Sequence, residues 1–522
     1  MKTLGQLLGA SLLEADAPLA ETPIFGVTLD SRTVKPGDLF FAVAGAKLDA
    51  RSFIPAAVSA GAAAVAIEGD SRSIQAHAGA ALGTVIGVRD IRAACAMAAA
   101  EFYDRPSEKL LTIGVTGTNG KTSVTWILAE SLARLGAPTV HVGTLGMRVV
   151  SMVPTAEISW RSIPNTSPDP ISFQSFLAEG VAIGARNAVS EVTSQGLLQA
   201  RTAEVAWDAA VFTNLTRDHL DLHGSMQAYS DAKAKLFLEE LVFSTKPRRV
   251  ATINCADPVG AELASRLRKE HPDLKVVSFS TAPAAETDGA LDAFVVEARC
   301  SLDRTEIDCV VFGVPLKITS RLIGAFNVEN LLAAAATLLG LGFPAAEVSR
   351  AIASVPQVPG RLEVAKPASV SVVIDYAHTP DALVKAQRSL REIGAGRLIT
   401  VFGCGGDRDR GKRPLMGAAV AEYSDVAVVT SDNPRSEDPA RIIDDILPGI
   451  SIDLQSGRRC GRVYALPDRR EALREAIRIA APGDTVLVAG KGHEDYQEAH
   501  GVRTPFSDIE ICRELVDELL SR

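Results

Sequence analysis

The chain has 522 residues, of which 47% are hydrophobic and 22% are charged. This is the composition of a globular protein, and the length exceeds what one hydrophobic core supports, so several domains are expected. The net charge of −9 argues against a nucleic-acid-binding protein, which needs a basic surface. The seven cysteines are scattered between Cys95 and Cys512, a pattern that predicts free thiols rather than a disulfide framework.

The sequence carries no strong targeting or membrane signal. Its first residues contain one lysine and a short apolar run that meets Glu14 and Asp16, which makes a poor signal peptide. The longest uncharged run, 331–346, is interrupted by two glycines and a proline. It is shorter than the roughly 20 residues that cross a membrane. We therefore expect a cytoplasmic protein without membrane insertion.

The first 106 residues are predicted to form an α/β domain. Strands are expected at 27–29, 38–43 and 64–67, and an alanine-rich helix at 54–60. No constellation of catalytic side chains is evident in this part of the sequence, so a structural domain is one interpretation of it.

The strongest functional signal is LTIGVTGTNGKT at 111–122. An apolar strand runs into a glycine turn, and a helix begins at Lys121 and Thr122. Glycines let backbone N–H groups approach phosphates, and a helix N-terminus favours anions. Lys121 would add a positive charge, and the Thr122 hydroxyl would reach Mg²⁺. Because Val115 stands where the usual phosphate-loop motif has its first glycine, an ordinary glycine turn is the alternative interpretation.

A second domain is predicted at 107–356, where strands alternate with helices as in a parallel sheet. Polar clusters at 165–170, 188–194 and 212–221 are expected at or after the ends of strands. Ligands of parallel sheets gather at the carboxyl ends of the strands. One acid or histidine at such a place is often structural, but three clusters beside a phosphate loop predict a binding site.

A third domain is predicted at 357–522. Strands expected at 370–376, 398–402, 426–430 and 485–489, with a helix at 380–393, indicate a doubly wound, Rossmann-like sheet. The run 403–406, GCGG, lacks the dinucleotide-binding spacing, so NAD is not expected. Arginines and lysines gather in the loops of this domain, which predicts an anionic ligand in an otherwise acidic protein.

Four motifs in succession carry a resemblance to a known family. GTNGKT, EVTSQGL, FTNLTRDHLDLHG and YSDAKAKLF are similar, in order and spacing, to motifs of the Mur ligases and the related folylpolyglutamate synthetases. The run LDSRTVKPGDLFFAVAG near the N-terminus resembles the UDP-binding domain of the same family. The resemblance covers nearly the whole chain. It implies three α/β domains, which bind a UDP-sugar (1–106), ATP (107–356) and an amino acid (357–522).

The resemblance implies ATP as co-substrate and Mg²⁺ as cofactor. Thr122 and Glu191 would hold one Mg²⁺ and His219 a second. Lys233 matches a lysine that the family carries as a CO₂-derived carbamate, whose anionic oxygens suit Mg²⁺; a solvated helix lysine is the alternative. The implied catalytic residues are Lys121, Glu191, His219 and Lys233. The implied ATP-binding residues are Gly117, Thr118, Asn119, Gly120, Lys121, Thr122, Asn327, Asn330 and Arg361.

Two further substrates follow from the resemblance. The UDP-N-acetylmuramoyl dipeptide would contact Ser31, Thr166, Ser167, Thr193, Gln199 and Arg201. meso-Diaminopimelate would contact Arg408, Asp432, Asn433, Pro434, Arg435, Gly490 and Glu494. In the family, Asp-Asn-Pro-Arg is typical of the branch that adds diaminopimelate, because an arginine can grip its second carboxylate through two hydrogen bonds. Lysine ends in a cation, which Arg435 would repel.

The predicted function is ATP-dependent amide ligation in peptidoglycan synthesis. The γ-carboxylate of the D-glutamyl residue would be phosphorylated and then attacked by the amine of diaminopimelate. The enzyme is expected to be a monomer that binds small molecules and no nucleic acid. Alternatives within the superfamily are the L-lysine-adding and D-alanyl-D-alanine-adding ligases and folylpolyglutamate synthetase. Alternatives outside it are a P-loop ATPase switch and a non-catalytic nucleotide-sugar binder.

Overall fold

The computed structural model describes residues 2–13, 19–45, 49–70, 84–152, 160–218, 220–281, 291–365, 369–394, 396–450 and 459–520. The chain divides into two compact units: Met1–Phe294 with Val311–Val314 and Leu332–Ala351, and Val295–Val310 with Pro315–Leu331 and Ile352–Arg522. The predicted domain boundaries at 106 and 356 stay predictions. Within the described ranges, no helix has the length and apolar character to cross a membrane.

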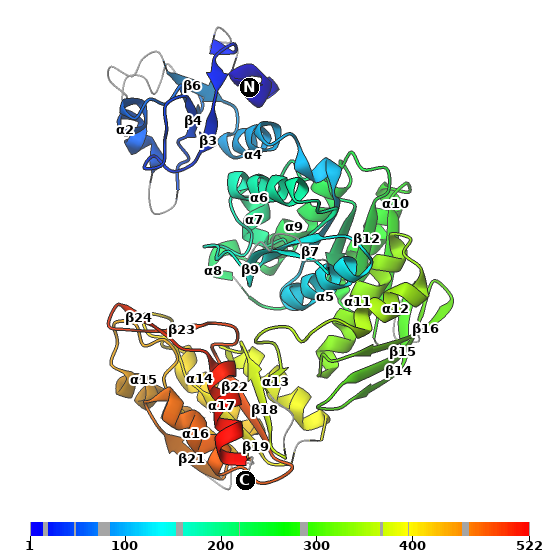
Figure 1. Ribbon diagram of the computed structural model, residues 1–522, viewed down its shortest axis with the longest axis vertical. Helices are drawn as coiled ribbons and strands as arrows, with labels where there is room; N and C mark the ends of the chain where they lie inside the picture. Colours follow the sequence, from blue (N-terminus) through cyan, green and yellow to red (C-terminus); the bar gives the residue numbers. More distant parts are fainter. Residues whose placement is uncertain are drawn as a thin grey trace. The chain divides into compact units, whose positions relative to one another are not determined.

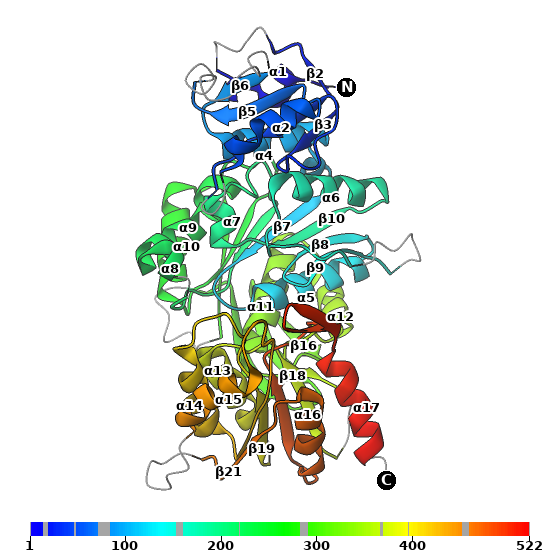
Figure 2. The same ribbon diagram turned by 90° about the vertical axis from the view of Figure 1, so that its left-hand side faces the viewer.

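A four-stranded parallel sheet forms the N-terminal part of the first unit (Figure 2). Three of its strands confirm the predicted ones to within two residues, and the fourth was not predicted. Its helix α4 begins where the Asp90 side chain accepts hydrogen bonds from the backbone N–H groups of Arg92 and Ala93. The elements are α1 (Leu4–Leu8), β3 (Gly26–Thr28), β4 (Asp38–Phe41), α2 (Ile54–Ser59), β5 (Ala64–Glu68), β6 (Val85–Val88) and α4 (Ile91–Phe102), with the short pair β1 (Lys2–Thr3) and β2 (Pro23–Ile24).

The central sheet has ten strands in the order β16-β15-β14-β13-β12-β11-β7-β10-β8-β9. Strand β7 lies between β10 and β11, and both pairings are parallel. The strands are β7 (Leu111–Thr116), β8 (Thr139–Gly143), β9 (Gly146–Val150), β10 (Asn187–Glu191), β11 (Ala209–Phe212), β12 (Val250–Asn254), β13 (Lys275–Ser280), β14 (Ala293–Cys300), β15 (Thr305–Val311) and β16 (Val314–Ser320).

Helices cover both faces of this sheet (Figure 1). Helices α6, α7, α9 and α10 lie on one face, and α5, α11 and α12 on the other. The helices are α5 (Lys121–Arg134), α6 (Pro170–Ala182), α7 (Ser194–Leu198), α8 (Leu220–His223), α9 (Met226–Lys235), the π-helix η5 (Leu236–Leu241), α10 (Pro258–Glu270), α11 (Ala325–Gly340) and α12 (Ala345–Ala353).

The strict alternation of strand and helix predicted for 107–356 is wrong at both edges of the sheet. Strand β9 follows β8 directly and pairs with it in antiparallel fashion. Strands β14, β15 and β16 also follow one another without a helix. The physical reason is burial. Along β15, fully buried residues alternate with partly exposed ones, so one face needs no covering helix.

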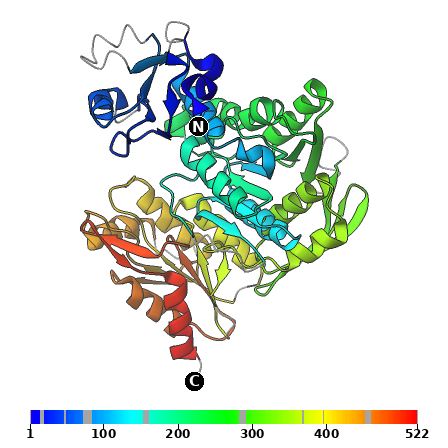
Figure 3. The ribbon, with the colours of Figure 1, turned by 45° about the horizontal axis from the view of Figure 1, so that its top comes forward.

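The second unit contains a six-stranded sheet in the order β17-β18-β22-β19-β20-β21. All pairings are parallel except that of β17 with β18, which confirms the predicted doubly wound sheet. The C-terminal helix α17, red in Figures 1 and 3, packs against α16. The elements are β17 (Glu363–Val364), β18 (Ser371–Asp375), α13 (Pro380–Glu392), β19 (Leu398–Phe402), α14 (Lys412–Tyr423), β20 (Val426–Val429), α15 (Pro439–Ile446), β21 (Arg462–Ala465), α16 (Arg469–Arg478), β22 (Thr485–Ala489), β23 (Tyr496–Ala499), β24 (Val502–Pro505) and α17 (Asp508–Leu520).

A fully buried ion pair ties helices α16 and α17 to the strand ends of this sheet. Arg469 Nε and Nη2 donate to the two carboxylate oxygens of Asp508 at 2.8 and 2.6 Å. The same guanidinium donates to the carbonyl oxygens of Ser431 (3.1 Å) and Ala489 (3.0 Å). Ala489 is the last residue of β22, and Ser431 lies two residues after the end of β20, so the pair holds the two loops at these strand ends.

We expect Arg469→Ala to destabilise the second unit by about 3–5 kcal/mol, because it leaves the Asp508 carboxylate buried without its partner. Chemical denaturation followed by circular dichroism measures this change. The matched control is Arg470→Ala, which removes an exposed pair with Glu514 and should cost about 0.5 kcal/mol or less. Equal losses of stability in the two variants would contradict the assignment.

Candidate functional site

The predicted phosphate loop connects the buried strand β7 to α5. Gly117 has φ 147° and Gly120 has φ 85°, a region that glycine adopts at little cost. Helix α5 begins at Lys121, directly after Gly120. The backbone N–H groups of its first turn are therefore available to an anion.

The segment after β11 braces this loop. The Thr213 hydroxyl donates to the carbonyl of Asn119 at 2.6 Å, and the N–H of Asn119 donates to the side chain of Asn214 at 3.0 Å. A Cβ atom on Gly117 would lie 1.9 Å from Thr213 Oγ1. The close approach, as well as the backbone angle, therefore requires glycine at this position.

Two lysines from different helices meet at the loop. Lys121 Nζ donates to the carbonyl oxygens of Gly117 and Thr118, at 2.9 Å each. Lys233, on α9 and 2% exposed, donates from Nζ to the same Gly117 carbonyl at 2.8 Å. Burial, and next the charge of Lys121, lower the pKa of Lys233 well below its usual value. Lys233 is therefore not the solvated helix lysine of the alternative interpretation.

Glu191 is the last residue of β10 and is 1% exposed. Its carboxylate accepts hydrogen bonds from the backbone N–H and the hydroxyl of Thr144, at 2.8 and 3.2 Å. A Cβ atom on Gly143 would lie 2.4 Å from Glu191 Oε1, so this glycine makes room for the acid. Glu191 stands opposite Val115 in the pairing of β10 with β7, which brings the acid beside the start of the loop.

The donor set fits a hard divalent cation. Thr122 would contribute a hydroxyl and Glu191 a carboxylate, and Mg²⁺ prefers such oxygen ligands while keeping several waters. His219 lies outside the described residues. Among the described residues, no cluster of three or more His, Cys, Asp or Glu side chains could hold a metal. A magnesium ion at this place would therefore be bound by the Thr122 hydroxyl, by water molecules and by groups that do not belong to a cluster of three such side chains.

The residues predicted for the muramyl dipeptide, apart from Ser31, form one hydrogen-bonded network at the end of β10 and the loop before α6. Ser167 Oγ donates to the carbonyl of Glu191 at 3.0 Å and accepts from the Thr193 N–H at 3.0 Å. Arg201 donates to the Ser167 carbonyl at 2.7 Å, and to Gln199 Oε1 at 2.6 Å. The hydroxyls of Thr166 and Thr144 lie 3.3 Å apart. Ser31 is placed elsewhere, in the turn after β3.

The predicted adenine-side residues and Arg361 belong to the second unit. Asn330 donates to the side chain of Asn327 at 2.9 Å, as expected for two residues three positions apart on a helix. Asn327 also donates to the Ile323 carbonyl at 2.8 Å. The Arg361 guanidinium lies 4.8 Å from the Tyr376 ring centroid, a cation–π contact.

A compact polar cluster forms where β20 and β22 end. Lys491 is fully buried and donates to Glu494 at 3.1 Å and to Asn433 at 3.2 Å. Asn433 also donates to Glu494 at 2.8 Å. Burial raises the pKa of Asp432, and its Oδ1 makes no hydrogen bond within the described part of the chain. A Cβ atom on Gly490 would lie 3.7 Å from Asp432.

Two predicted arginines flank one glycine beside this cluster. A Cβ atom on Gly405 would lie 2.8 Å from Arg435 Nη1 and 3.7 Å from Arg408 Cγ. Arg435, which follows Pro434, has φ 53°, a strained angle for a residue with a side chain. Its guanidinium donates to the Gly406 carbonyl at 2.8 Å. Such strain persists only where the surroundings hold the residue in place.

The sequence did not single out Thr144 as a site residue. Lys491 belongs to the run GKGHE at 490–494, which the resemblance places in the amino-acid pocket, but only Gly490 and Glu494 of that run were predicted as contacts. Thr144 has no signal in the sequence, because its role depends on Glu191, 47 positions away along the chain.

Three family models match successive parts of the chain: the Mur ligase family catalytic domain at 23–103, the Mur ligase middle domain at 115–338 and the Mur ligase glutamate ligase domain at 360–492. UDP-N-acetylmuramoyl-L-alanyl-D-glutamate–2,6-diaminopimelate ligase of Geobacter metallireducens is 41% identical over 98% of this chain and 97% of its own. The protein of the same name from Pseudomonas aeruginosa is 44% identical over 93% of each chain. A solved structure of a ligase of that name covers 99% of both chains with a TM-score of 0.71 and 32% identity.

A braced glycine loop, a buried strand-end acid and a doubly wound second sheet, together with these matches, define an ATP-dependent ligase. The chain belongs to the Mur ligase family.

We expect Gly117→Ala to abolish nucleotide binding, because the added methyl group would collide with Thr213 and displace the loop. Isothermal titration with a non-hydrolysable ATP analogue measures the loss. The matched control is Gly136→Ala. Gly136 has φ 112° but no atom within 4 Å of an added Cβ, so it carries the same kind of backbone penalty, about 1 kcal/mol, without the collision. If Gly117→Ala bound the ATP analogue as tightly as the parent does, the close contact between Gly117 and Thr213 would not be required for nucleotide binding.

Proposed function

We propose that this enzyme joins meso-2,6-diaminopimelate to the γ-carboxylate of the D-glutamyl residue of UDP-N-acetylmuramoyl-L-alanyl-D-glutamate. The reaction converts ATP to ADP and phosphate and belongs to peptidoglycan synthesis. The observation that carries the proposal is the 41–44% identity, over 93–98% of the chain, to ligases named for these two substrates. The polar clusters at the strand ends support it.

In the first step, the loop 117–122 holds the ATP phosphates while the γ-carboxylate of the dipeptide attacks the terminal phosphorus. Lys121 moves from the Gly117 and Thr118 carbonyls to the phosphates, where its charge offsets the charge of the transferring group. The network of Ser167, Thr193 and Arg201 orients the dipeptide. Thr122 and Glu191 would hold Mg²⁺, which would neutralise charge at the phosphates when bound.

In the second step, the amine of diaminopimelate attacks the acyl phosphate, the C–N bond forms and phosphate leaves. Arg408 and Arg435 bind carboxylates of the amino acid. Asp432, whose buried Oδ1 makes no hydrogen bond within the described part of the chain, and Glu494 accept hydrogen bonds from its ammonium groups. Lys491 Nζ lies 3.1 Å from Glu494 Oε2 and holds that carboxylate in place.

Lys233 is carbamylated in the active enzyme. Its neutral amine adds CO₂, an N–C bond forms, and one proton leaves to solvent. The burial of Lys233 and its place beside the phosphate loop support this, together with the motif YSDAKAKLF. The carbamate provides anionic oxygens where an ammonium would repel Mg²⁺.

The enzyme acts as a monomer in the cytoplasm, where ATP and nucleotide-linked sugars are made. ADP release with the UDP-muramyl dipeptide against a panel of amino acids tests the proposal. A ligase releases ADP only with both substrates present, whereas an ATPase switch hydrolyses ATP without them. Release with L-lysine or D-alanyl-D-alanine in place of diaminopimelate would assign the enzyme to another branch of the family.

We expect Lys233→Ala to lower kcat by about 100-fold or more, with partial rescue by formate or acetate at high concentration, since a small carboxylate replaces the carbamate. Steady-state ADP release measures both effects. The control is Lys235→Ala, which removes a surface pair with Glu239 and should leave the rate within about twofold. Full activity of Lys233→Ala without added carboxylate would refute the role.

We expect Arg435→Ala to lower kcat/KM for diaminopimelate by roughly 30-fold to several thousand-fold, since losing a desolvated charged contact costs about 2–5 kcal/mol. The KM for ATP should stay unchanged, because the phosphate loop lies in the other unit and Arg435 is not one of the residues predicted to bind ATP. Arg462→Ala on β21 serves as the control arginine and should have no effect. The Asp-Asn-Pro-Arg interpretation would be wrong if Arg435→Ala had the parent's kcat/KM for diaminopimelate. It would also be wrong if the parent used L-lysine as well as diaminopimelate.

A further inference from the structure

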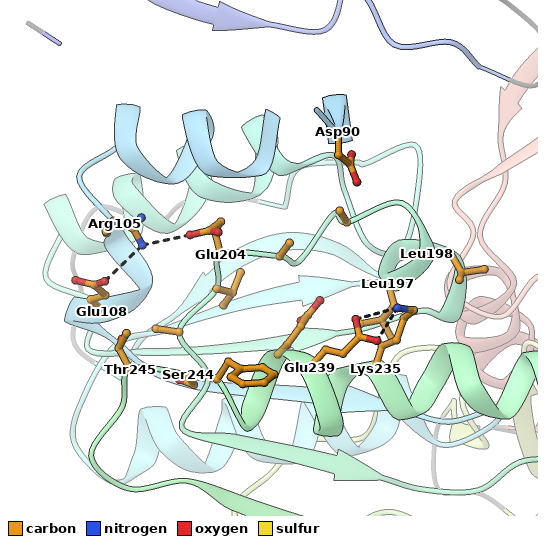
Figure 4. A pocket seen from close by; sticks show the side chains of 16 residues that line it. Asp90, Arg105, Glu108, Leu197, Leu198, Glu204, Lys235, Glu239, Ser244 and Thr245 are labelled. Atoms are coloured by element: carbon orange, nitrogen blue, oxygen red, sulfur yellow. Dashed lines mark hydrogen bonds and ion pairs between the residues drawn. The ribbon is translucent and has the colours of Figure 1, made fainter. Parts of the chain in front are cut away.

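A hollow of about 470 Å³ lies in the first unit (Figure 4), and its lining residues do not include the phosphate loop 117–122. Arg105 pairs with Glu204 on one side of it, and Lys235 pairs with Glu239 on another. Its wall includes Glu240, on the π-helix η5, and Leu197 and Leu198, which end α7. The hollow therefore lies between the π-helix η5, which follows Lys233 along the chain, and the segment that contains Gln199 and Arg201.

Both carboxylate oxygens of Glu240 accept hydrogen bonds from residues that follow Arg201 along the chain. Thr202 Oγ1 donates to Oε1 at 3.0 Å, and Trp207 Nε1 donates to Oε2 at 2.9 Å. Thr202 directly follows Arg201, and both Thr202 and Trp207 are 1% exposed. One side chain thus fixes the segment 202–207 at two points.

The backbone of the same segment is strained. Ala200 has φ 52° and Glu204 has φ 65°, a region that residues with side chains adopt at a cost of roughly 1–3 kcal/mol each. Thr202 lies midway between them. A strained backbone keeps its conformation only where its surroundings hold it, and the Thr202–Glu240 hydrogen bond is such a restraint. The π-helix is a second irregular feature, of a kind that often occurs at functional sites.

We propose that Glu240 is a positioning residue for the muramyl-dipeptide substrate, an inference that rests on the proposed function. By holding Thr202 and Trp207, it keeps Arg201 in the conformation in which Arg201 donates to the Ser167 carbonyl and to Gln199. The π-helix that carries Glu240 continues directly from α9, which carries Lys233. Glu240 thereby connects the segment that contains Arg201 and Thr202 to α9, which carries the lysine proposed to be carbamylated.

The protonation state of Glu240 should adjust this restraint near neutral pH. Burial raises the pKa of Glu240 to about 7. This effect outweighs the hydrogen bonds from Trp207 and Thr202, which lower the pKa. The raised pKa means that the buried site favours the neutral acid, so the restraint is strongest at low pH. It weakens as the pH rises toward about 7, because opening of the segment would let the carboxylate ionise in water. The charged groups around it are Lys235 and Glu239 on its own helical segment, and Asp90, Arg105, Glu108 and Glu204 from the other elements that line the hollow.

The test compares Glu240→Ala and Glu240→Gln with Glu239→Ala and Glu239→Gln in the full-length enzyme. Glu239 is the exposed neighbour on the same helix, so it is a matched control. Kinetic constants for each substrate are measured from about pH 6 to about pH 8, the range over which Glu240 titrates. Hydrogen exchange of the segment 199–206 is measured without substrate.

We expect Glu240→Ala to raise the KM for the dipeptide by about tenfold or more, with kcat and the KM for ATP within about twofold of the parent. Hydrogen exchange in the segment should become faster. Glu240→Gln keeps the shape and neutral hydrogen bonds of the protonated acid, so its KM should equal that of the parent at low pH. As the pH rises toward about 7, only the parent acquires a buried charge, so its KM should rise above that of Glu240→Gln.

Three results would overturn the inference. The first is a Glu240→Ala enzyme that behaves like Glu239→Ala. The second is an equal loss in every kinetic constant, which would indicate a structural role only. The third is a Glu240→Gln enzyme with the pH dependence of the parent. A parent that makes no amide would refute the proposed function itself, whereas an active parent with any of these three results refutes only the role of Glu240.

Discussion

Parallel strand pairing is the constraint on which both units depend. It places the carboxyl ends of neighbouring strands at one edge of a sheet, so residues far apart in sequence meet there. Glu191 lies opposite Val115, two residues before Gly117, and Phe212 lies opposite Thr116. In the second sheet, Asp375 lies opposite Ala489. The registers of these strands therefore determine which loops can share a ligand.

Charged groups buried at these edges are held by partners instead of by solvent. Arg469 is held by Asp508 and two carbonyls, and Lys491 by Glu494 and Asn433. A buried charge without a partner is costly, whereas a fully hydrogen-bonded one is oriented before any substrate arrives. Preorganisation of this kind lowers the barrier to phosphoryl and acyl transfer. It is also why single substitutions at these positions should affect stability and activity together.

Close packing of backbone against side chains explains the glycines at the site. Gly117 admits Thr213, and Gly143 admits the carboxylate of Glu191. In each case a methyl group would occupy the space of a polar atom that holds the loop. The opposite case occurs at Ala200 and Glu204, after α7, where residues with side chains adopt glycine-like angles. There the hydrogen bond from Thr202 to Glu240 offsets part of the strain.

The sequence by itself determined the elements and the chemistry that depend on local order. Apolar runs bounded by glycines predicted β7, β19 and β22 closely, the order of motifs predicted the family, and the loop predicted the start of α5. Tertiary structure alone decided the contacts between distant residues. Examples are the shared carbonyl of Gly117, the Thr144 bonds to Glu191 and the bridge from Glu240 to Thr202 and Trp207. The uncovered strands β14–β16 also depend on which face is buried. Burial and strand register are properties of the whole fold, so no local pattern could specify them.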